Sequence, residues 1–368
     1  TATATTAPAT TTAPPPPAAP WPMWGFDLAH TRYNPEAQQR PPFRVLWRYS
    51  ARDLVEFPPA VDDTGVYFCA NNGTVFAVVP RTGQLRWKRQ VKAPLAVTPT
   101  LDADTAYVSS LGGEVYAIRK DDGTIRWTFD VGSRTESSPI LVDDTLYFGA
   151  ESGTLFALDP QTGKVRWTAK ANGPLKASPA YADGRLYIGS YGGDVYAFDA
   201  KTGRQIWTTE SIGRYGGLSR GTFYATPAVA YGRVYISGTD RRVYSLVAAT
   251  GEIAWTTSTD NEVYSSPAIY DRTVYVGSYD RHFYALDART GAKRWVFDAN
   301  GRISGAPSVV NGIVYFATLD TGSFGLDAGT GALAWRNLDG RYAPVVATRD
   351  AFYFTGAGSV ARLEPVNP

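Results

Sequence analysis

The sequence predicts an all-β fold, an eight-bladed β-propeller of four-stranded antiparallel blades that is closed by an N-terminal strand. Three observations predict it. The chain of 368 residues repeats one pattern with a period of about 40 residues. Within each repeat, apolar and polar residues alternate at period two between regularly spaced turn signals. The 36 glycines and 23 tyrosines favour short strands and tight turns over helices.

The repeat is marked most clearly by tryptophan. Eight tryptophans follow one another at intervals of 40 residues, with a single interval of 48. Their uniform position in the predicted outer strand indicates docking and packing residues rather than cofactor ligands. These structural tryptophans are Trp47, Trp87, Trp127, Trp167, Trp207, Trp255, Trp295 and Trp335.

One unit, residues 177–207, shows how the elements are assigned. SPAYA (178–182) is predicted as strand A, and a DG turn leads to strand B at 185–190. A YGG turn leads to strand C at 194–200, and a KTG turn leads to strand D, which ends on Trp207. The glycine of the last turn supplies a positive φ. Four strands in about 40 residues describe one propeller blade.

The two ends of the repeat are predicted to share a blade. An eighth unit begins at Pro344, but the chain ends before its tryptophan. Residues 43–49, FRVLWRY, form a strand D with no strands A, B or C before it. This strand should complete the C-terminal blade and leave no free edge. The chain then divides into a tail or linker (1–20), a lead segment (21–42) and the propeller (43–368).

The tail, TATATTAPATTTAPPPPAAP, carries no charge and cannot bury enough apolar surface to offset its ordering entropy. Its four consecutive prolines favour polyproline II. Two interpretations stay open. The tail is a stalk or linker of an exported protein with an upstream anchor, or it is an arm that docks on another copy. Tyr191 and Tyr279, in predicted B–C turns, are candidates to line the groove for such an arm, which would build a filament.

Composition excludes several classes of protein. The net charge of +2 shows no basic excess, which argues against nucleic acid as a partner. A single cysteine, Cys69, excludes an internal disulfide and every CxxC motif, and two histidines make a His-rich metal site improbable. No apolar run approaches the roughly 20 residues of a membrane span, so we expect no transmembrane segment in this chain.

The repeat resembles the PQQ-type propeller repeat, here as SSPAIYDRTVYVGSYDRHFYALDARTGAKRW at residues 265–295. The resemblance covers about residues 43–366. The lead sequence WPMWGFDLAHTRYNP (21–35) is also similar to the start of quinoprotein dehydrogenase propellers. The same repeat occurs in the BamB family of outer-membrane assembly lipoproteins and in extracellular sensor domains of bacterial receptor kinases. The resemblance therefore implies a fold shared by several functions.

A quinoprotein alcohol dehydrogenase would imply PQQ over the ring axis, a calcium ion, a catalytic aspartate and a vicinal disulfide. Cys69 alone cannot form that disulfide, and no aspartate lies in a matching motif. The strict 40-residue spacing leaves no room for the long insertions that build the site in those enzymes. We therefore expect no catalytic residue, no cofactor and no metal.

Functional residues are expected where the repeats differ. The D–A and B–C loops of a propeller surround a funnel on one face. Each repeat has a proline at the start of its predicted strand A: Pro59, Pro99, Pro139, Pro179, Pro227, Pro267, Pro307 and Pro344. The residues three positions before these prolines form a predicted ring around the funnel. Their charges nearly balance, and two adjacent tyrosines interrupt the ring, which suits a peptide or a sugar better than a phosphate. The ring is Glu56, Ala96, Glu136, Lys176, Tyr224, Tyr264, Ser304 and Arg341.

One irregular connection, residues 211–224, is eight residues longer than its counterparts. It adds Arg214, Tyr215, Leu218 and Arg220, and Tyr and Arg are enriched in binding hot spots. A tolerated surface insertion is the alternative interpretation.

Together these patterns favour a non-catalytic, extracytoplasmic scaffold for protein interaction or assembly at the cell surface. Its partner is expected to be a protein or peptide, another copy of itself included. The alternatives are a PQQ-dependent oxidoreductase, the ligand-sensing ectodomain of a membrane receptor and a filament subunit linked through its tail.

Overall fold

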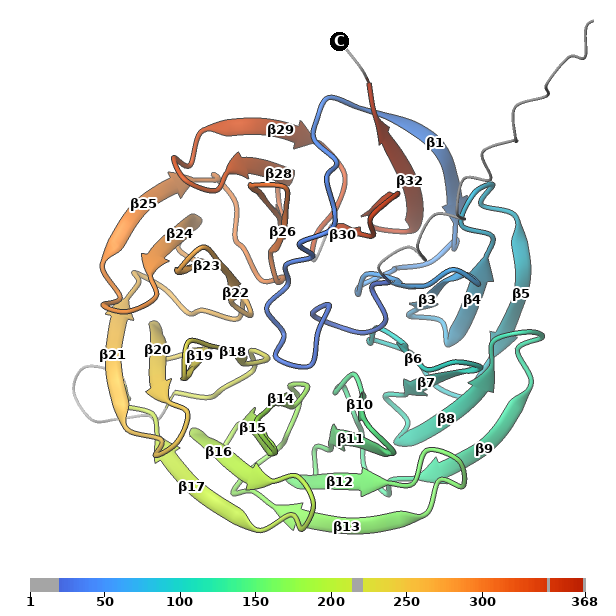
Figure 1. Ribbon diagram of the computed structural model, residues 1–368, viewed down its shortest axis with the longest axis horizontal. Helices are drawn as coiled ribbons and strands as arrows, with labels where there is room; N and C mark the ends of the chain where they lie inside the picture. Colours follow the sequence, from blue (N-terminus) through green and yellow to red (C-terminus); the bar gives the residue numbers. More distant parts are fainter. Residues whose placement is uncertain (1–19, 214–220, 343–344, 367–368) are drawn as a thin grey trace, which may run out of the picture.

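A computed structural model describes residues 20–213, 221–342 and 345–366 of the chain. Its 32 strands form eight four-stranded antiparallel sheets arranged in a ring around a central axis (Figure 1). The eight-bladed propeller predicted from the repeat is thereby confirmed. The tail, residues 1–19, lies outside the described residues, and so do Arg214, Tyr215, Leu218 and Arg220.

Each blade runs from strand A at the axis to strand D at the rim (Figure 1). Blades 1 and 2 comprise β2 (Ala60–Val61), β3 (Val66–Ala70), β4 (Thr74–Val78), β5 (Leu85–Gln90), and β6 (Thr100–Leu101), β7 (Thr105–Ser109), β8 (Glu114–Arg119), β9 (Ile125–Asp130). Blades 3 and 4 comprise β10 (Ile140–Val142), β11 (Thr145–Gly149), β12 (Thr154–Leu158), β13 (Val165–Lys170), and β14 (Ala180–Ala182), β15 (Arg185–Gly189), β16 (Asp194–Asp199), β17 (Gln205–Glu210). Blades 5 and 6 comprise β18 (Ala228–Ala230), β19 (Arg233–Gly238), β20 (Arg242–Val247), β21 (Ile253–Ser258), and β22 (Ala268–Tyr270), β23 (Thr273–Gly277), β24 (His282–Asp287), β25 (Lys293–Asp298). Blades 7 and 8 comprise β26 (Ser308–Val310), β27 (Ile313–Thr318), β28 (Gly322–Asp327), β29 (Leu333–Asn337), and β30 (Val345–Ala347), β31 (Phe352–Thr355), β32 (Ser359–Pro365), β1 (Phe43–Ser50).

Strand A is shorter than the sequence pattern predicts. In blade 4 it begins at Ala180 rather than at Ser178, because Pro179 has no N–H group to donate to the neighbouring strand. The predicted strands B and C of this blade agree with β15 and β16 to within one residue.

Blade 8 closes the ring as predicted. Its strand order is β1-β32-β31-β30, so β1 pairs antiparallel with β32. Trp47 lies opposite Arg362 in this pairing, and Phe43 stacks on Phe352 of β31 with the ring centroids 4.4 Å apart. The strand from the N-terminal end therefore covers an edge that β32 would otherwise expose.

The tryptophans of strand D join neighbouring blades. The indole N–H of Trp87 in blade 1 donates to the carbonyl of Lys120 in blade 2 at 2.8 Å. Equivalent bonds, 2.9–3.1 Å long, are made by Trp47, Trp127, Trp167, Trp207, Trp255 and Trp295. The indole also covers the glycine of the next blade's last turn. At Gly123, where φ is +72°, an added Cβ would lie 2.6 Å from Cε3 of Trp87.

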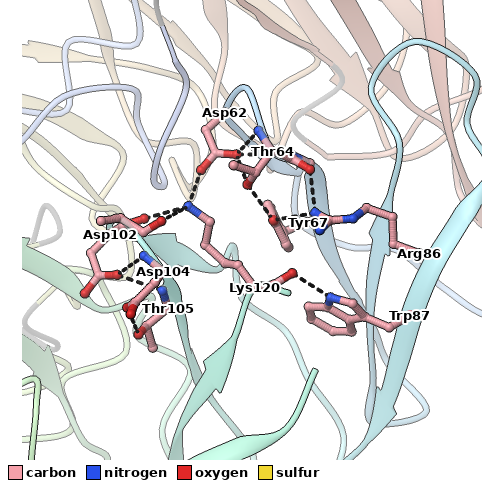
Figure 2. A network of polar contacts seen from close by, with 11 residues as sticks. Asp62, Thr64, Tyr67, Arg86, Trp87, Asp102, Asp104, Thr105 and Lys120 are labelled. Atoms are coloured by element: carbon pink, nitrogen blue, oxygen red, sulfur yellow. Dashed lines mark hydrogen bonds and ion pairs between the residues drawn. The ribbon is translucent and has the colours of Figure 1, made fainter. Parts of the chain in front are cut away.

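The contact between blades 1 and 2 carries an additional buried ion pair (Figure 2). Lys120 is almost fully buried, and its Nζ lies 2.5 Å from a carboxylate oxygen of Asp62. The same ammonium donates to the carbonyls of Asp102 and Ala103 at 2.7 and 2.9 Å. All three acceptors lie in the A–B turns of the two blades, so one side chain fixes these turns to each other.

Residues 21–34, the axial segment, lie across the middle of the ring (Figure 1). The segment forms hydrogen bonds with seven blades, most of them to strand A. The bonded pairs are Trp21 with Val61, Pro22 with Leu101, Leu28 with Tyr181, Ala29 with Val229, Thr31 with Ile269, Arg32 with Val309, and Asn34 with Ala347. Met23 packs in the core cluster that contains Ile140 of blade 3. The lead segment thus plugs the ring, which the sequence pattern does not predict.

Candidate functional site

The axial segment supplies the floor of the site. Trp24 is nearly buried, donates its indole N–H to the hydroxyl of Thr226 at 3.2 Å and packs edge-on against Phe57. On the segment itself, the guanidinium of Arg32 lies 5.1 Å from the centroid of the Trp24 ring. Trp24 is therefore fixed by contacts with blades 1 and 5 and by a cation from its own segment.

Two ionisable groups of the axial segment are completely buried. Nη1 of Arg32 donates to the carbonyls of His30 and Pro267, both at 2.8 Å, and burial lowers the pKa of Arg32 to about 9. The imidazole Nε2–H of His30 donates to the carbonyl of Pro179 at 3.0 Å. Burial, reinforced by the nearby positive charge of Arg32, lowers the pKa of His30 to about 3. His30 is thus neutral in the folded protein at ordinary pH.

Acid is expected to destabilise the fold through His30. Below the ordinary pKa of 6.5 the unfolded chain binds a proton that the folded chain, with a His30 pKa of about 3, does not bind. This residue should therefore reduce the free energy of unfolding by about 1.4 kcal/mol for each pH unit below 6.5. Urea titrations at pH 7 and pH 4.5 measure this contribution.

His30→Gln is the matched variant for that measurement, because its amide can still donate to Pro179 but does not titrate. The variant should lose less stability than the parent between the two pH values. Equal losses in the two chains would show that His30 does not carry this dependence.

Above Trp24, the loops that precede the strands A enclose a cavity of about 60 Å³, which we call the basin. It opens on the face that carries the D–A and B–C loops. Its lining comes from seven of the eight blades and from the axial segment. The lining residues are Trp24, Glu56, Phe57, Glu136, Lys176, Ala177, Ser178, Tyr224, Thr226, Tyr264, Ser266, Ser304, Gly305, Ala306 and Tyr342.

The charged groups of the basin largely neutralise one another. Nζ of Lys176 lies 3.1 Å from a carboxylate oxygen of Glu136 and 3.2 Å from one of Glu151. Burial, together with the negative charge of Glu136, raises the pKa of Glu56 above its ordinary value. The basin is therefore a poor site for a free anion, which would meet two carboxyl groups and a lysine that is already paired.

Four half-buried tyrosines form a row beside the basin, the tyrosine arc: Tyr191, Tyr224, Tyr264 and Tyr279. Successive ring centroids are 6.2, 6.0 and 4.7 Å apart. Nζ of Lys176 lies 5.3 Å from the centroid of the first ring, and the guanidinium of Arg302 lies 5.9 Å from that of the last. Burial raises the pKa of Tyr191 and that of Tyr224. The hydroxyls of Tyr191 and Tyr224 thus stay protonated, and the arc places aromatic rings across blades 4–6.

The structure places most of the predicted ring together. Glu56, Glu136, Lys176, Tyr224, Tyr264 and Ser304 all line the basin, whereas Ala96 is buried and does not. Arg341 is exposed and is not among the lining residues; its neighbour Tyr342 lines the basin instead. The residue three positions before Pro344 therefore does not line the basin as its counterparts do, because blade 8 lacks the regular spacing of the other blades. The count also misses Trp24, which comes from outside the repeat.

The propeller matches a known protein family along its whole length. The family model described as outer membrane protein assembly factor BamB matches residues 43–174, 167–269, 193–338 and 262–365. Together these matches span the whole propeller. The chain belongs to the BamB family. No curated protein sequence matches it significantly.

Solved structures share the propeller. BamB from Moraxella catarrhalis superimposes with a TM-score of 0.75 and 18% identity, covering 88% of this chain and 100% of that chain. The quinohemoprotein alcohol dehydrogenase from Comamonas testosteroni gives a TM-score of 0.79 and 14% identity, covering 95% of this chain and 81% of the other. A europium-containing methanol dehydrogenase gives a TM-score of 0.76 and 13% identity, covering 94% and 98%. At these identities the likeness concerns the fold alone.

The described residues do not fit the PQQ and calcium that the resemblance to quinoprotein alcohol dehydrogenases implies. A basin of about 60 Å³ is far smaller than the roughly 300–1,000 Å³ of typical small-molecule sites, and its two glutamates repel a tricarboxylate such as PQQ. Among the described residues no group of three or more His, Cys, Asp or Glu side chains is placed to hold a metal ion. Cys69 is buried in the core cluster of blades 1 and 2, away from the basin. Among the described residues, the basin is therefore not shaped for that cofactor.

No segment of the described chain forms a helix long and apolar enough to cross a membrane.

Proposed function

We propose that this BamB-family chain is a non-catalytic scaffold that holds a protein or peptide partner outside the cytoplasm, with the basin and the tyrosine arc as its contact surface. One observation carries the proposal. The axial segment lies across the ring and supplies Trp24 to a small basin of about 60 Å³ on the loop face, which is bordered by a row of tyrosines.

The chemistry of the arc supports a macromolecular partner. Tyrosine offers a large rigid contact area together with a hydroxyl that donates or accepts, and it is enriched at protein interfaces. Half-buried rings lose little conformational freedom on binding, because their neighbours already hold them. The family description as an assembly factor is consistent with such a role, and with a location at or near the outer membrane.

Further residues belong to the proposed contact surface. Glu136, Lys176, Tyr224 and Tyr264 lie at the basin, and Arg341 is exposed beside Tyr342. The loop residues Arg214, Tyr215, Leu218 and Arg220 are proposed to extend the surface, since their loop lies between strand D of blade 4 and Tyr224 in the sequence.

Site-specific photo-crosslinking tests the proposal. A photoreactive phenylalanine analogue at position 264 should crosslink in intact cells to one or a few discrete proteins. The matched control is position 231, because Tyr231 is 58% exposed but lies in an A–B turn on the opposite face. Purified protein with added PQQ and calcium should show no saturable quenching of tryptophan fluorescence and no dye-linked alcohol oxidation.

Two results would overturn the scaffold. One is an equal crosslinking pattern at positions 264 and 231, which would show no preference for the arc. The other is stoichiometric PQQ binding with alcohol oxidation, which would make the chain an oxidoreductase.

A further inference from the structure

We propose that residues 1–19 of one copy of the chain dock on the tyrosine arc of a second copy, so that the molecules assemble head to tail. The inference rests on the arc being a contact surface, as proposed above, and adds the identity of one occupant.

The tyrosine arc has the chemistry of a surface that binds polyproline II. An aromatic-lined groove is the surface that proteins use to bind polyproline II segments. The path from ring to ring along the arc, in steps of 6.2, 6.0 and 4.7 Å, corresponds to about five residues at 3.1 Å per residue. Residues 14–18 of this chain, PPPPA, have that length and that preference.

The tail leaves the ring beside turns of blades 1 and 8. Pro20 borders Asp62, Asp63, Arg81 and Asp350, which belong to A–B and C–D turns. Trp21 is held there by two backbone hydrogen bonds with Val61, both 2.8 Å. In an antiparallel blade these turns lie at the face opposite the B–C and D–A loops. The tail therefore starts on the face opposite the tyrosine arc.

The axis of the ring offers no passage between its two faces. The axial segment is hydrogen-bonded to seven blades, so residues 1–19 cannot thread through the ring to the arc of their own copy. A second copy stacked head to tail presents its arc directly to them. Such a contact uses two different surfaces, so it is heterologous and repeats from copy to copy.

The absence of charge in residues 1–19 also suits the tyrosine arc. Residues 1–19 contain no ionisable side chain, and the backbone of polyproline II is free of internal hydrogen bonds. Its carbonyls can accept from tyrosine hydroxyls, which are donors as well as acceptors. Contact between an uncharged segment and ring faces is little affected by screening. Assembly should therefore persist at high salt.

Sedimentation velocity of the full chain over a hundredfold concentration range tests the proposal. The sedimentation coefficient should rise with concentration, equally at 0.1 M and 1 M salt. Tyr264→Ala/Tyr279→Ala should weaken self-association at least tenfold, and Tyr231→Ala on the opposite face should not change it. A chain that begins at Pro20 retains all described elements and should remain a monomer. A synthetic peptide of residues 1–19 should dissociate the full-chain assembly.

Melting temperatures of the variants separate loss of assembly from loss of fold. A full chain that is monomeric at every concentration overturns the head-to-tail contact, and so does assembly that survives in the arc variant. If that monomeric chain still crosslinks at position 264, the scaffold function stands and only this occupant is wrong. Assembly that disappears at 1 M salt also overturns the proposal, because it would indicate a charged contact.

Discussion

A chain that begins at Ala51 is expected to lose its cooperative unfolding transition and to aggregate. This truncation removes β1, which pairs with β32 along seven residue pairs, and it removes the axial segment as well. Without β1, the strand β32 (Ser359–Pro365) becomes an exposed edge with unpaired backbone groups. Circular dichroism melts together with light scattering measure both effects.

Two shorter truncations serve as controls for this result. A chain that begins at Pro20 keeps every described element and should melt within about 2 °C of the full chain. A chain that begins at Arg40 keeps β1 but lacks the axial segment, so it should melt at an intermediate temperature. Equal melting temperatures for the chains that begin at Pro20 and Ala51 would contradict the closure of the ring by β1.

Trp87→Ala is expected to lower the free energy of unfolding by about 3–5 kcal/mol, the usual range for truncation of a large buried aromatic side chain. The indole of Trp87 is 7% exposed, packs near Tyr67 in its own blade and covers Gly123 of the next. Its removal leaves a void between two blades and frees the carbonyl of Lys120 from its donor. Chemical denaturation of the variant measures the loss.

Trp87→Phe separates the two parts of that loss. Phenylalanine keeps most of the ring contact but cannot donate to Lys120, so the loss should fall to about 1–2 kcal/mol. A ligand-stacking role for Trp87 predicts the opposite outcome for the alanine variant, which would then retain its stability.

The propeller was predictable because the sequence pattern of one blade is repeated along the chain. A single unit shows alternation and turn signals, and seven further copies make the period unmistakable, so that the number of blades and the closing strand follow by counting. The axial segment has no such repetition. Each of its contacts is one or two hydrogen bonds to a different blade, and its tight turns use residues such as Gly25, where φ is +81°. Nothing in the spacing of its residues indicates these partners.

The repeated part of the candidate site was likewise predictable, and the part outside the repeat was not. The D–A loops have a constant offset from the prolines, so counting finds the wall residues Glu136, Lys176 and Tyr264. The floor residue Trp24 belongs to the aperiodic segment and could not be found by counting. The tyrosine arc joins residues from two kinds of loop on neighbouring blades. Their proximity depends on how the blades are inclined to one another, which one repeat does not specify.

The axial segment also determines when a newly made molecule can be complete. Residues 21–34 leave the ribosome before any blade exists, yet Asn34 finds its partner Ala347 only 313 residues later. Closing a loop of that length is slow, since its entropy is lost before the contact forms. The hydrogen-bonding groups of the segment therefore stay bonded to water until the blades that pair with them have been synthesised. A ring whose axial segment bonds to blade 8 is therefore complete only after that blade has been synthesised.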